Sequence, residues 1–367
     1  MTPALESILV TGGCGFIGSN FIRHLFSRRD FTGRVVNLDR LTYAGNPENL
    51  EDLDAPPGGY SFVHGDVADP ELPFRVMREH RVDTVVHFAA ESHVDRSIHA
   101  PGEFVRTNIE GTFRLLEAAR AAWGDREDVR FHQVGTDEVF GSLGAEGRFS
   151  ESSPYDPRSP YSASKAAADH LVRAYHHTYG LPVTLSNCSN NYGPFQFPEK
   201  LIPLMILNLT RRHPLPVYGD GGNVRDWLYV EDHCRAIWRI LTAAPAGTTW
   251  TVGGDAEMAN LEVVHRLCDI FDTRRPMNPG AADTSGNPLN SHRDLISFVT
   301  DRPGHDRRYA MDSRRIQEEL DWLPETDFRQ GLERTVSWYL DHGDWVEHIR
   351  SGAYRQWLQS HYGDRGE

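Results

Sequence analysis

The 367-residue sequence has only four cysteines, no block of basic residues and no long apolar run. The cysteines are far apart and form no Cys-x-x-Cys pair, so neither a disulfide framework nor a metal site is expected. No stretch reaches the roughly 18 uninterrupted apolar residues that a membrane-spanning helix needs. A strand pattern begins almost at the first residue and leaves no room for a signal peptide. These absences predict a cytoplasmic protein.

The charge balance excludes two kinds of partner. The formal net charge is −14, whereas proteins that bind nucleic acid or an anionic membrane surface carry a concentrated basic patch. We therefore expect neither partner. A small anionic ligand is compatible with this charge, because it needs only a few local donors. The length suffices for two domains, or for one large domain with insertions.

The first half of the chain alternates strand patterns with amphipathic helical patterns. Helices are expected over residues 104–123 and 161–179. The expected strands are residues 7–11, 34–39, 60–63, 84–88, 130–134 and 183–185. Near-continuous apolar strands alternating with such helices indicate a parallel sheet covered on both faces. The predicted fold class is α/β, a doubly wound parallel sheet of the Rossmann type with a smaller, discontinuous C-terminal domain.

The alternation of strand and helix patterns ends at about Asn191, where Pro, Gly and Asn become frequent. Residues 225–241 are expected to return to the first domain as a strand and a helix, and residues 274–292 to form a surface loop. The aromatic stretch 338–362 is expected to be helical. The predicted first domain comprises residues 1–190 and 224–254. The predicted second domain comprises residues 191–223 and 255–367.

A glycine-rich loop between a strand and a helix points to a dinucleotide. Gly13-x-Gly15-x-x-Gly18 matches the dinucleotide fingerprint, and Gly12 with Gly15 and Gly18 fits a close variant. Glycines allow the tight turn and the close approach of the pyrophosphate, and the helix N-terminus attracts phosphate. A plain structural turn is the alternative. The contacts expected from the loop are Gly12, Gly13, Gly15, Phe16, Ile17 and Gly18.

Strand ends beyond the loop favour NAD as the cofactor. Asp39 ends the second strand about 20 residues on, where an acid binds the adenosine ribose and repels a 2′-phosphate. Arg40 beside it weakens the preference over NADP, because an arginine accepts that phosphate. Asp66 and Val67 follow the third strand, where the adenine edge is read or a plain turn lies. The fourth strand ends in Phe88, Ala89 and Ala90, and the small alanines allow close approach of a cofactor.

Tyr161 and Lys165 are four residues apart and share one face of the predicted helix, which Ser159 and Pro160 begin well. A free tyrosine has a pKa of about 10, and bringing it near 7 takes roughly 4 kcal/mol. A nearby ammonium and a cationic nicotinamide ring together supply this. The phenolate then takes a proton from a sugar hydroxyl as hydride leaves the same carbon. A surface tyrosine and a solvated lysine are the alternative.

Asp137 and Glu138 are neighbours just past a predicted strand end, where open α/β sheets bind ligands. On a regular strand they would point to opposite faces, so both reach one substrate only if the chain leaves the strand there. Elimination of water from a keto sugar needs one group to remove a proton and another to protonate the departing hydroxyl. A solvated acidic turn is the alternative.

These segments resemble the extended short-chain dehydrogenases and, within them, the dTDP-glucose 4,6-dehydratases. The resemblance covers residues 8–18, 41–46, 89–97, 136–138, 159–165, 187–194, 197–203, 225–232 and 301–308. It implies a tightly held NAD, dTDP-glucose as substrate and a homodimer that packs the helices of Phe104 and Tyr161. Tyr161 would be the base at C4 with Thr136 bonded to that hydroxyl, Glu138 the base at C5, and Asp137 the acid at C6.

The resemblance also implies binding residues. Further cofactor contacts are Leu41, Thr42, Ser92, Thr107 and Asn191, besides Tyr161 and Lys165. Substrate contacts are Ser92, Thr136, Asn190, Lys200, Leu201, Pro216, Val217, Tyr218, Arg225, Asn260, Asp301, Arg302, Pro303, Gly304 and His305. Two departures stand out, since the family usually has Ser at Gly135 and Tyr at Phe140.

Three alternatives stay open. A nucleotide-sugar 4-epimerase also uses NAD and a Tyr/Lys pair, but it needs no acid pair because it reduces the carbon that it oxidised. A 4,6-dehydratase acting on UDP- or CDP-glucose would use the same chemistry. A catalytically silent NAD-sensing protein belongs to a different class, against which the intact Tyr161 and Lys165 weigh.

Overall fold

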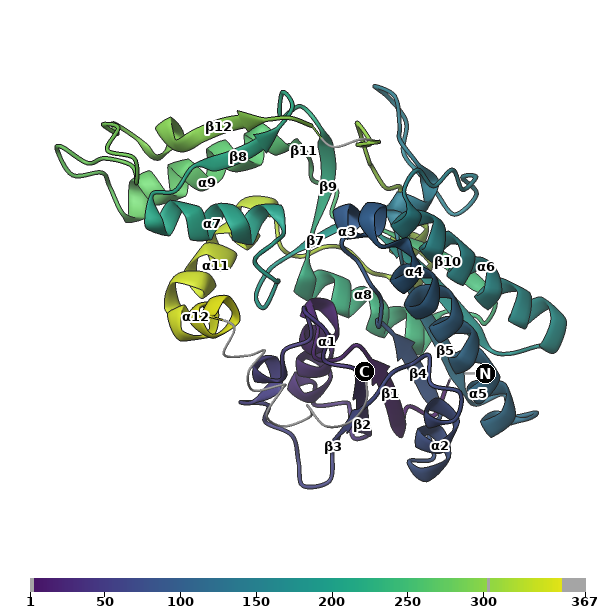
Figure 1. Cartoon of the computed structure of the whole chain (residues 1–367). Helices are drawn as coiled ribbons and strands as arrows, with labels where there is room; N and C mark the ends of the chain where they lie inside the picture. The colour runs from purple at the N-terminus through teal and green to yellow at the C-terminus, as the bar shows by residue number, and fades with distance from the viewer. Residues whose placement is uncertain (1–2, 302–303, 352–367) are drawn as a thin grey trace.

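A parallel sheet of seven strands, in the order β10-β6-β5-β4-β1-β2-β3, forms the centre of the computed structural model, which describes residues 3–301 and 304–351 (Figure 1). Its strands are β1 (Ser7–Thr11), β2 (Arg34–Asp39), β3 (Tyr60–His64), β4 (Thr84–His87), β5 (Arg130–Thr136), β6 (Val183–Cys188) and β10 (Thr248–Val252). Every predicted strand of the first half is present, although β5 and β6 run further than expected. The predicted doubly wound parallel sheet is confirmed.

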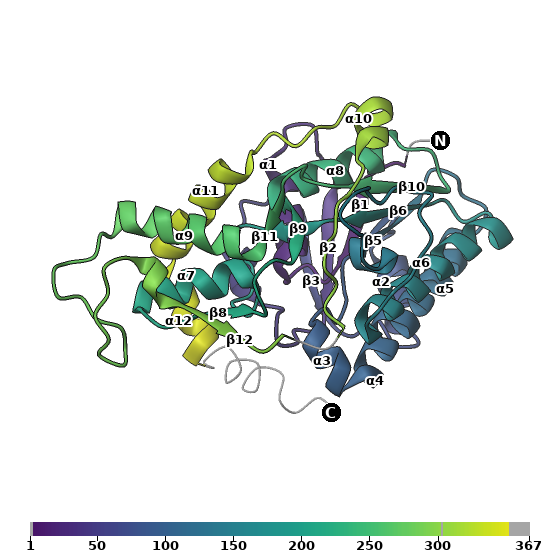
Figure 2. The ribbon, with the colours of Figure 1, turned by 90° about the horizontal axis from the view of Figure 1, so that it is seen from above.

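Helices cover both faces of this sheet, and Figure 2 shows the strands between the two layers. One layer contains α2 (Leu72–Glu79), α5 (Gly111–Trp123) and α6 (Pro160–Tyr179). There Leu115 and Val172 pack against Val85 of the sheet. The other layer contains α1 (Phe16–Ser27) and α8 (Val230–Ala243), with α10 (Arg314–Leu320) beside β10. There Phe21 and Ile237 pack on the alternate residues of the same strands.

A second body lies beside the C-terminal strand ends (Figures 1 and 2). It contains a three-stranded sheet of β7 (Asn190–Tyr192), β9 (Val224–Tyr229) and β11 (Glu257–Ala259), and a pair of parallel strands, β8 (Leu215–Tyr218) and β12 (Ile296–Val299). Its helices are α7 (Leu201–Arg211), α9 (Asn260–Arg274), α11 (Phe328–Asp341) and α12 (Gly343–Ser351). Ile206, Leu267 and Leu332 contribute to its core.

One strand was assigned wrongly from the sequence. Residues 225–241 were predicted to return to the first domain as a strand and a helix, but the strand, β9, pairs with β7 and β11 and not with the large sheet. The reason is its side chains, because Trp227 and Tyr229 pack into the core of the second body. The helix that follows, α8, does pack on the large sheet, and β10 supplies the returning strand. The domain division drawn from the sequence stays a prediction.

The remaining elements are short. They are η1 (Pro47–Leu50), α3 (Val94–His99), α4 (Pro101–Phe104), η2 (Val105–Glu110), η3 (Asp137–Phe140) and η4 (His292–Leu295). The helix predicted over residues 104–123 is α4, η2 and α5 in succession, with η2 wound as a π-helix. The expected loop lies between α9 and η4. Residues 352–362 of the expected C-terminal helices lie outside the described residues. Within the described ranges, no helix has both the length and the apolar character to cross a membrane.

Candidate active site

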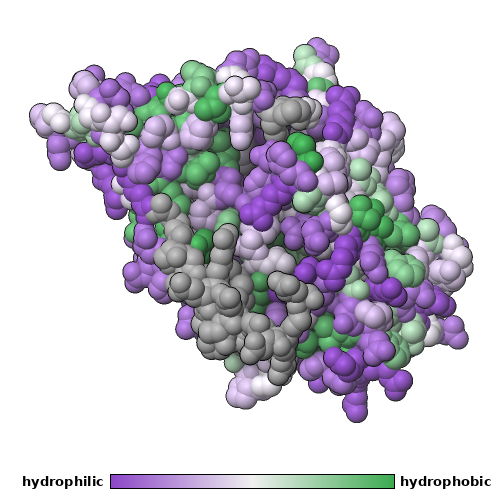
Figure 3. Space-filling view, viewed as in Figure 1, coloured by the Kyte–Doolittle hydropathy of each residue, from purple (hydrophilic) through white to green (hydrophobic). Residues whose placement is uncertain are grey.

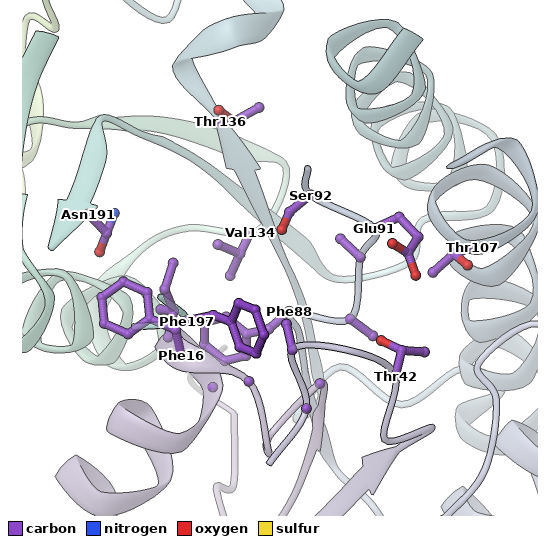
Figure 4. Close-up of a pocket in the computed structure, with 18 of the residues that line it drawn as sticks. Phe16, Thr42, Phe88, Glu91, Ser92, Thr107, Val134, Thr136, Asn191 and Phe197 are labelled. Carbon is purple, nitrogen blue, oxygen red and sulfur yellow. The ribbon is translucent and has the colours of Figure 1, made fainter. Parts of the chain in front are cut away.

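The carboxyl ends of the central strands open onto a cavity of about 320 Å³. Figure 4 shows Thr42, Glu91 and Thr107 on one side of it, Phe197 and Asn191 on the other, and the end of β5 between them. The lining contains most of the predicted cofactor contacts. They are Gly12, Gly15, Phe16, Ile17, Gly18, Asp39, Arg40, Thr42, Asp66, Val67, Phe88, Ala89, Ala90, Ser92, Thr107, Tyr161, Lys165 and Asn191.

The glycine loop at this cavity has no room for side chains. Gly12 has φ of +71°, and a Cβ there would lie 2.7 Å from the backbone nitrogen of Ala89. A Cβ on Gly18 would lie 2.3 Å from the carbonyl oxygen of Gly12. Helix α1 starts at Gly15 with no side-chain cap, so its first N–H groups face the cavity as a pyrophosphate site requires. Gly13 does not line the cavity, and a Cβ there would lie 2.3 Å from the Asn37 amide oxygen.

The acids at the strand ends fit a ribose better than a phosphate. The buried Asp39 carboxylate accepts hydrogen bonds from the backbone N–H groups of Cys14 (2.9 Å) and Leu41 (2.8 Å). Burial raises the pKa of Asp39, while these two bonds lower it. Arg40 already faces Asp66 at 3.5 Å and Glu103 at 3.8 Å. Its charge is thus matched by acids, which favours NAD over NADP. Leu41 lies outside the lining and anchors Asp39 instead.

Strand β5 ends just before the neighbouring acids Asp137 and Glu138. β5 stops at Thr136 and η3 begins at once. The Thr136 hydroxyl caps this turn, accepting from the N–H of Glu138 (3.3 Å) and donating to the Asp137 carboxylate (3.2 Å). Because a 3-10 turn replaces the pleat, both carboxyl groups line one cavity together with Tyr161 and Lys165. The structure therefore brings all five predicted catalytic residues together.

Asp137 has the properties of a proton donor. The residue is 2% exposed, and its Oδ2 atom has no hydrogen-bond partner among the described residues. Burial and the neighbouring charge of Glu138 raise the pKa of Asp137 well above its ordinary value, against a smaller opposing effect of Arg225. Glu138 is only half-buried. The two carboxyl groups thus lie in different environments, as a division of acid and base roles requires.

Tyr161 and Lys165 project from the first turns of α6. Ser159 caps that helix through the N–H of Ser162 (3.0 Å), as the sequence predicts. Burial and the charge of Glu138 raise the pKa of Tyr161, while a hydrogen bond with Thr136 lowers it. The Lys165 ammonium donates to the carbonyl of Val134 at 2.8 Å. The expected lowering of the Tyr161 pKa is therefore not supplied by the protein groups alone.

The two departures from the family pattern have structural explanations. A Cβ on Gly135 would lie 2.5 Å from the Asn187 amide nitrogen and 3.1 Å from an Asp169 carboxylate oxygen. Phe140 is buried and stacks on Phe149, with 5.1 Å between the ring centroids. Neither position reaches the cavity with a polar side chain. Gly135 leaves room for a buried polar network, and Phe140 contributes packing.

Only part of the predicted substrate set lines this cavity. Thr136, Ser92, Asn190 and Lys200 do, and the Lys200 ammonium donates to the carbonyl of Ser92 at 3.1 Å. The predicted residues outside the lining are Leu201, Pro216, Val217, Tyr218, Arg225, Asn260, Asp301, Gly304 and His305. Arg302 and Pro303 lie outside the described residues. Most of this outer set belongs to the second body, and its role in binding substrate stays a prediction.

Within that outer set, Arg225 lies close enough to Asp137 to affect its pKa, whereas His305, Asp301 and Tyr218 lie next to one another. The guanidinium of Arg225 lies 4.4 Å from the Tyr309 ring centroid, and its charge lowers the pKa of Asp137. His305 approaches Asp301 at 2.6 Å, and the Tyr218 ring lies 6.2 Å from the His305 ring. The end of β8 and the segment around residue 305 are therefore neighbours although they are far apart in sequence.

Several lining residues had no role predicted from the sequence. These are Leu38, Ala44, Gly45, Gly65, Glu91, Val134, Gly135, Cys188, Ser189, Gln196, Phe197 and Glu199. Glu91 and Glu199 fall inside the resembling segments, yet neither belongs to a spaced motif. Gln196 and Phe197 follow β7, in a segment that contacts α1 where the Asn20 amide donates to the carbonyl of Pro194 at 3.0 Å. His233, buried on α8, bonds the Asn191 amide oxygen at 2.9 Å and so orients a predicted cofactor contact.

The sheet, the glycine loop and the Tyr161–Lys165 pair define an extended short-chain dehydrogenase. The family model described as GDP-mannose 4,6 dehydratase matches residues 9–335, and the chain belongs to that family. It is 53% identical to the dTDP-glucose 4,6-dehydratase of Xanthomonas campestris pv. campestris (strain B100) over 352 residues, which are 95% of this chain and 97% of that protein. The predicted resemblance is confirmed.

Solved structures agree with this assignment. DesIV, a dTDP-glucose 4,6-dehydratase from Streptomyces venezuelae with NAD and dTDP bound, superposes with a TM-score of 0.82 at 45% identity, covering 94% of this chain and 99% of DesIV. The UDP-glucose 4-epimerase of Thermus thermophilus, complexed with NAD, superposes at 0.76 with 28% identity, covering 92% and 99%. Since an epimerase shares the fold, the fold alone does not separate the two activities, and the site must do so.

Proposed function

We propose that the chain is an NAD-dependent lyase that converts dTDP-glucose to dTDP-4-keto-6-deoxyglucose and water. The observation that carries this proposal is the buried Asp137, with one oxygen unpartnered among the described residues, beside the half-buried Glu138 in one cavity with Tyr161. Dehydration needs a proton donor and a separate base. A 4-epimerase needs no such carboxyl pair besides its tyrosine, because it reduces the carbon that it oxidised.

The roles of the residues follow from the order of proton transfers. NAD supplies the hydride acceptor for C4 and the hydride that is returned to C6. Tyr161 takes the proton of the C4 hydroxyl, to which Thr136 is hydrogen-bonded. Glu138 removes the C5 proton, which the new ketone acidifies. Asp137, whose pKa burial and the charge of Glu138 raise well above its ordinary value, protonates the C6 hydroxyl as it leaves as water.

Binding is divided between the two bodies. The loop 12–18 and Asp39 hold the cofactor, and the crowding around Gly12 and Gly18 supports this, because an added Cβ at either position would collide with backbone. Asn190, Lys200, Asn260 and His305 hold the sugar nucleotide, with Arg225 as a charge-assisted donor to its diphosphate. The buried amide oxygens of Asn190 and Asn260 have no partner within the described residues, as expected for groups that bond a ligand.

A homodimer accompanies this function. Large apolar side chains stay exposed on the helices α3, η2, α5 and α6, including Val105 (54% exposed) and Tyr179 (54%). Hydrophobic surface gathers over these helices in Figure 3, as an interface would require. Val105→Glu is expected to give a monomer in light scattering. Leu323→Glu, at a position 61% exposed elsewhere, is the matched control.

A cytoplasmic location fits the same chain. Cys14, Cys188, Cys234 and Cys268 are all buried and free. Unpaired thiols are typical of a reducing compartment. Fractionation of cells that produce the protein is the direct measurement, and recovery in the secreted fraction would contradict this placement.

The test of the function is incubation of the purified protein with dTDP-glucose and no added NAD. Loss of one water, seen by mass, establishes the dehydratase and shows that the cofactor travels with the enzyme. Formation of dTDP-galactose with no change of mass would establish the epimerase instead. Parallel reactions with UDP-glucose and CDP-glucose measure the preference for the base. If no product forms in any of these reactions, with or without added NAD, the remaining alternative is a catalytically silent protein that binds NAD.

A further inference from the structure

A buried polar network lies directly behind the active-site strand end. Asp169, on α6, is fully buried. One oxygen of its carboxylate accepts from the Tyr155 hydroxyl and from the Asn187 amide, each at 2.9 Å. Arg173 donates to the Tyr155 hydroxyl at 2.8 Å. Nothing in the proposed reaction uses Asp169, although it lies one helical turn beyond Lys165.

The network reaches the reacting residues along two paths. The Asn187 amide that donates to Asp169 also donates to the backbone carbonyl of Thr136 at 3.2 Å. It therefore fixes the residue whose hydroxyl caps the turn of the acid pair. Lys165 and Asp169 are at i and i+4 and share one face of α6. The Lys165 ammonium donates to the carbonyl of Val134 on the same strand end.

The side chains of Asn187 and Asp169 pack directly against the backbone at Gly135, which leaves no room for a Cβ there. A Cβ at this position would meet the Asn187 amide nitrogen at 2.5 Å and the Asp169 carboxylate at 3.1 Å. The absence of a side chain lets Asn187 and Asp169 lie against the strand itself. The second oxygen of Asp169 has no hydrogen-bond partner among the described residues. Burial raises the pKa of Asp169, and the charge of Lys165 is the largest of the effects that lower it, so Lys165 is the cation that favours the charged carboxylate.

We propose that Asp169 is a positioning residue of the active site, which fixes the Thr136 end of β5 through Asn187 and supplies the countercharge for the buried Lys165 ammonium. The inference rests on the proposed function, because it assigns Asp169 a part in the same reaction. Asp169 does not touch the cavity. Its effect on the substrate passes through Lys165 and Thr136.

The charged groups around Lys165 determine in which direction the loss of the Asp169 charge shifts the pH profile of activity. Burial lowers the pKa of Lys165, while the charges of Asp169 and Cys188 raise it. His87, on β4, is the other titratable group that faces Lys165, and Tyr155 and Arg173 face Asp169. Removal of the Asp169 charge therefore leaves Lys165 easier to deprotonate. The loss of activity on the basic side then begins at lower pH.

The experiment is the pH profile of kcat and KM for Asp169→Asn, an isosteric change that removes the charge. We expect kcat to fall about tenfold with KM within about twofold of the wild type, and the basic limb to move down by about one pH unit. Asp128→Asn is the matched control, because the Asp128 carboxylate is exposed and pairs with Arg126 at the surface. Its profile should coincide with that of the wild type.

Tyr155→Phe provides a second variant. It removes one donor to Asp169 and keeps the ring, so the basic limb should move in the same direction by less. Thermal melting identifies variants that fold. An unchanged limb in the folded variants would overturn the role of Asp169 while the wild type still forms product. No product from the wild type itself would overturn the proposed function and this inference with it.

Discussion

At the scale of single residues, the site depends on two neighbouring carboxyl groups that are unlike each other. Asp137 is 2% exposed, with one oxygen unpartnered in the described part of the chain, whereas Glu138 is half-buried. The difference arises from the backbone, because the turn capped by Thr136 directs both groups to one cavity at different depths. Neighbours on a regular strand would face opposite sides of the sheet. The acid–base division is thus built into one turn.

Glu138→Gln separates the steps at this site. Oxidation at C4 needs only Tyr161 and the cofactor, so it should persist. Removal of the C5 proton loses its base, and product formation should fall by about 100-fold or more. The measurement is the uptake of solvent deuterium at C5 by mass spectrometry. Wild-type C5 exchange in the variant would remove Glu138 as the base.

At the scale of elements, the junction between β1 and α1 determines how closely a dinucleotide approaches. Gly12 has a positive φ and touches the backbone of Ala89 at the end of β4. Gly18 touches the carbonyl of Gly12 across the first turn of α1. Both positions therefore require glycine. A Cβ at either would collide with backbone, and Gly12 also has a left-handed backbone conformation that favours glycine.

Gly12→Ala tests that unit. The new Cβ would lie 2.7 Å from the Ala89 nitrogen, and left-handed strain adds to the collision, so stability should fall by about 1–3 kcal/mol. The purified variant should also retain less NAD per chain. Thermal melting and the NAD released by denaturation measure the two effects. Gly144→Ala is the control, since a Cβ there meets nothing within 4 Å. Equal melting temperatures and equal NAD contents in the two variants would show that Gly12 is not required for the fold or for cofactor binding.

Elements were predictable where a local pattern specifies them. The strands β1 to β6 of the large sheet, the Ser159 cap of α6 and the glycine loop appear where the sequence predicts them, whereas β10 was not predicted. β9 was misplaced because Trp227 and Tyr229 are apolar in either sheet, and only tertiary packing decides between them. The π-helical turn η2 has no signature in its residues. Glu199 and Gln196 line the cavity although no motif spacing in the sequence marks either residue.

At the scale of the whole molecule, the seven-stranded sheet and the helix α8 that packs on it contain histidines that burial keeps neutral. His87, His132 and His233 are each 1% exposed or less, and burial lowers the pKa of each to about 3. In the unfolded chain they take up protons below about pH 6.5. Their contribution to stability is therefore complete above about pH 6.5 and is lost as the pH falls toward about 3. Buried carboxyl groups with raised pKa values oppose this trend.

His132→Gln isolates one of these contributions. The difference in unfolding free energy between wild type and variant should shrink by about 3 kcal/mol between about pH 7 and about pH 4.5, at roughly 1.36 kcal/mol per unit below about 6.5. Urea unfolding at the two pH values measures it. A difference that stays constant with pH would show that His132 is not held neutral by burial.

The two bodies meet over one cavity, and the central claim is that a single chain oxidises C4 and reduces C6 of the same sugar there. The most direct test uses dTDP-glucose deuterated at C4, with purified protein and no added NAD, followed by mass and NMR analysis of the product. We expect a dehydrated 4-keto sugar that carries the deuterium at C6. Deuterium that stays at C4 in an epimerised sugar, or that is lost to solvent, would contradict it.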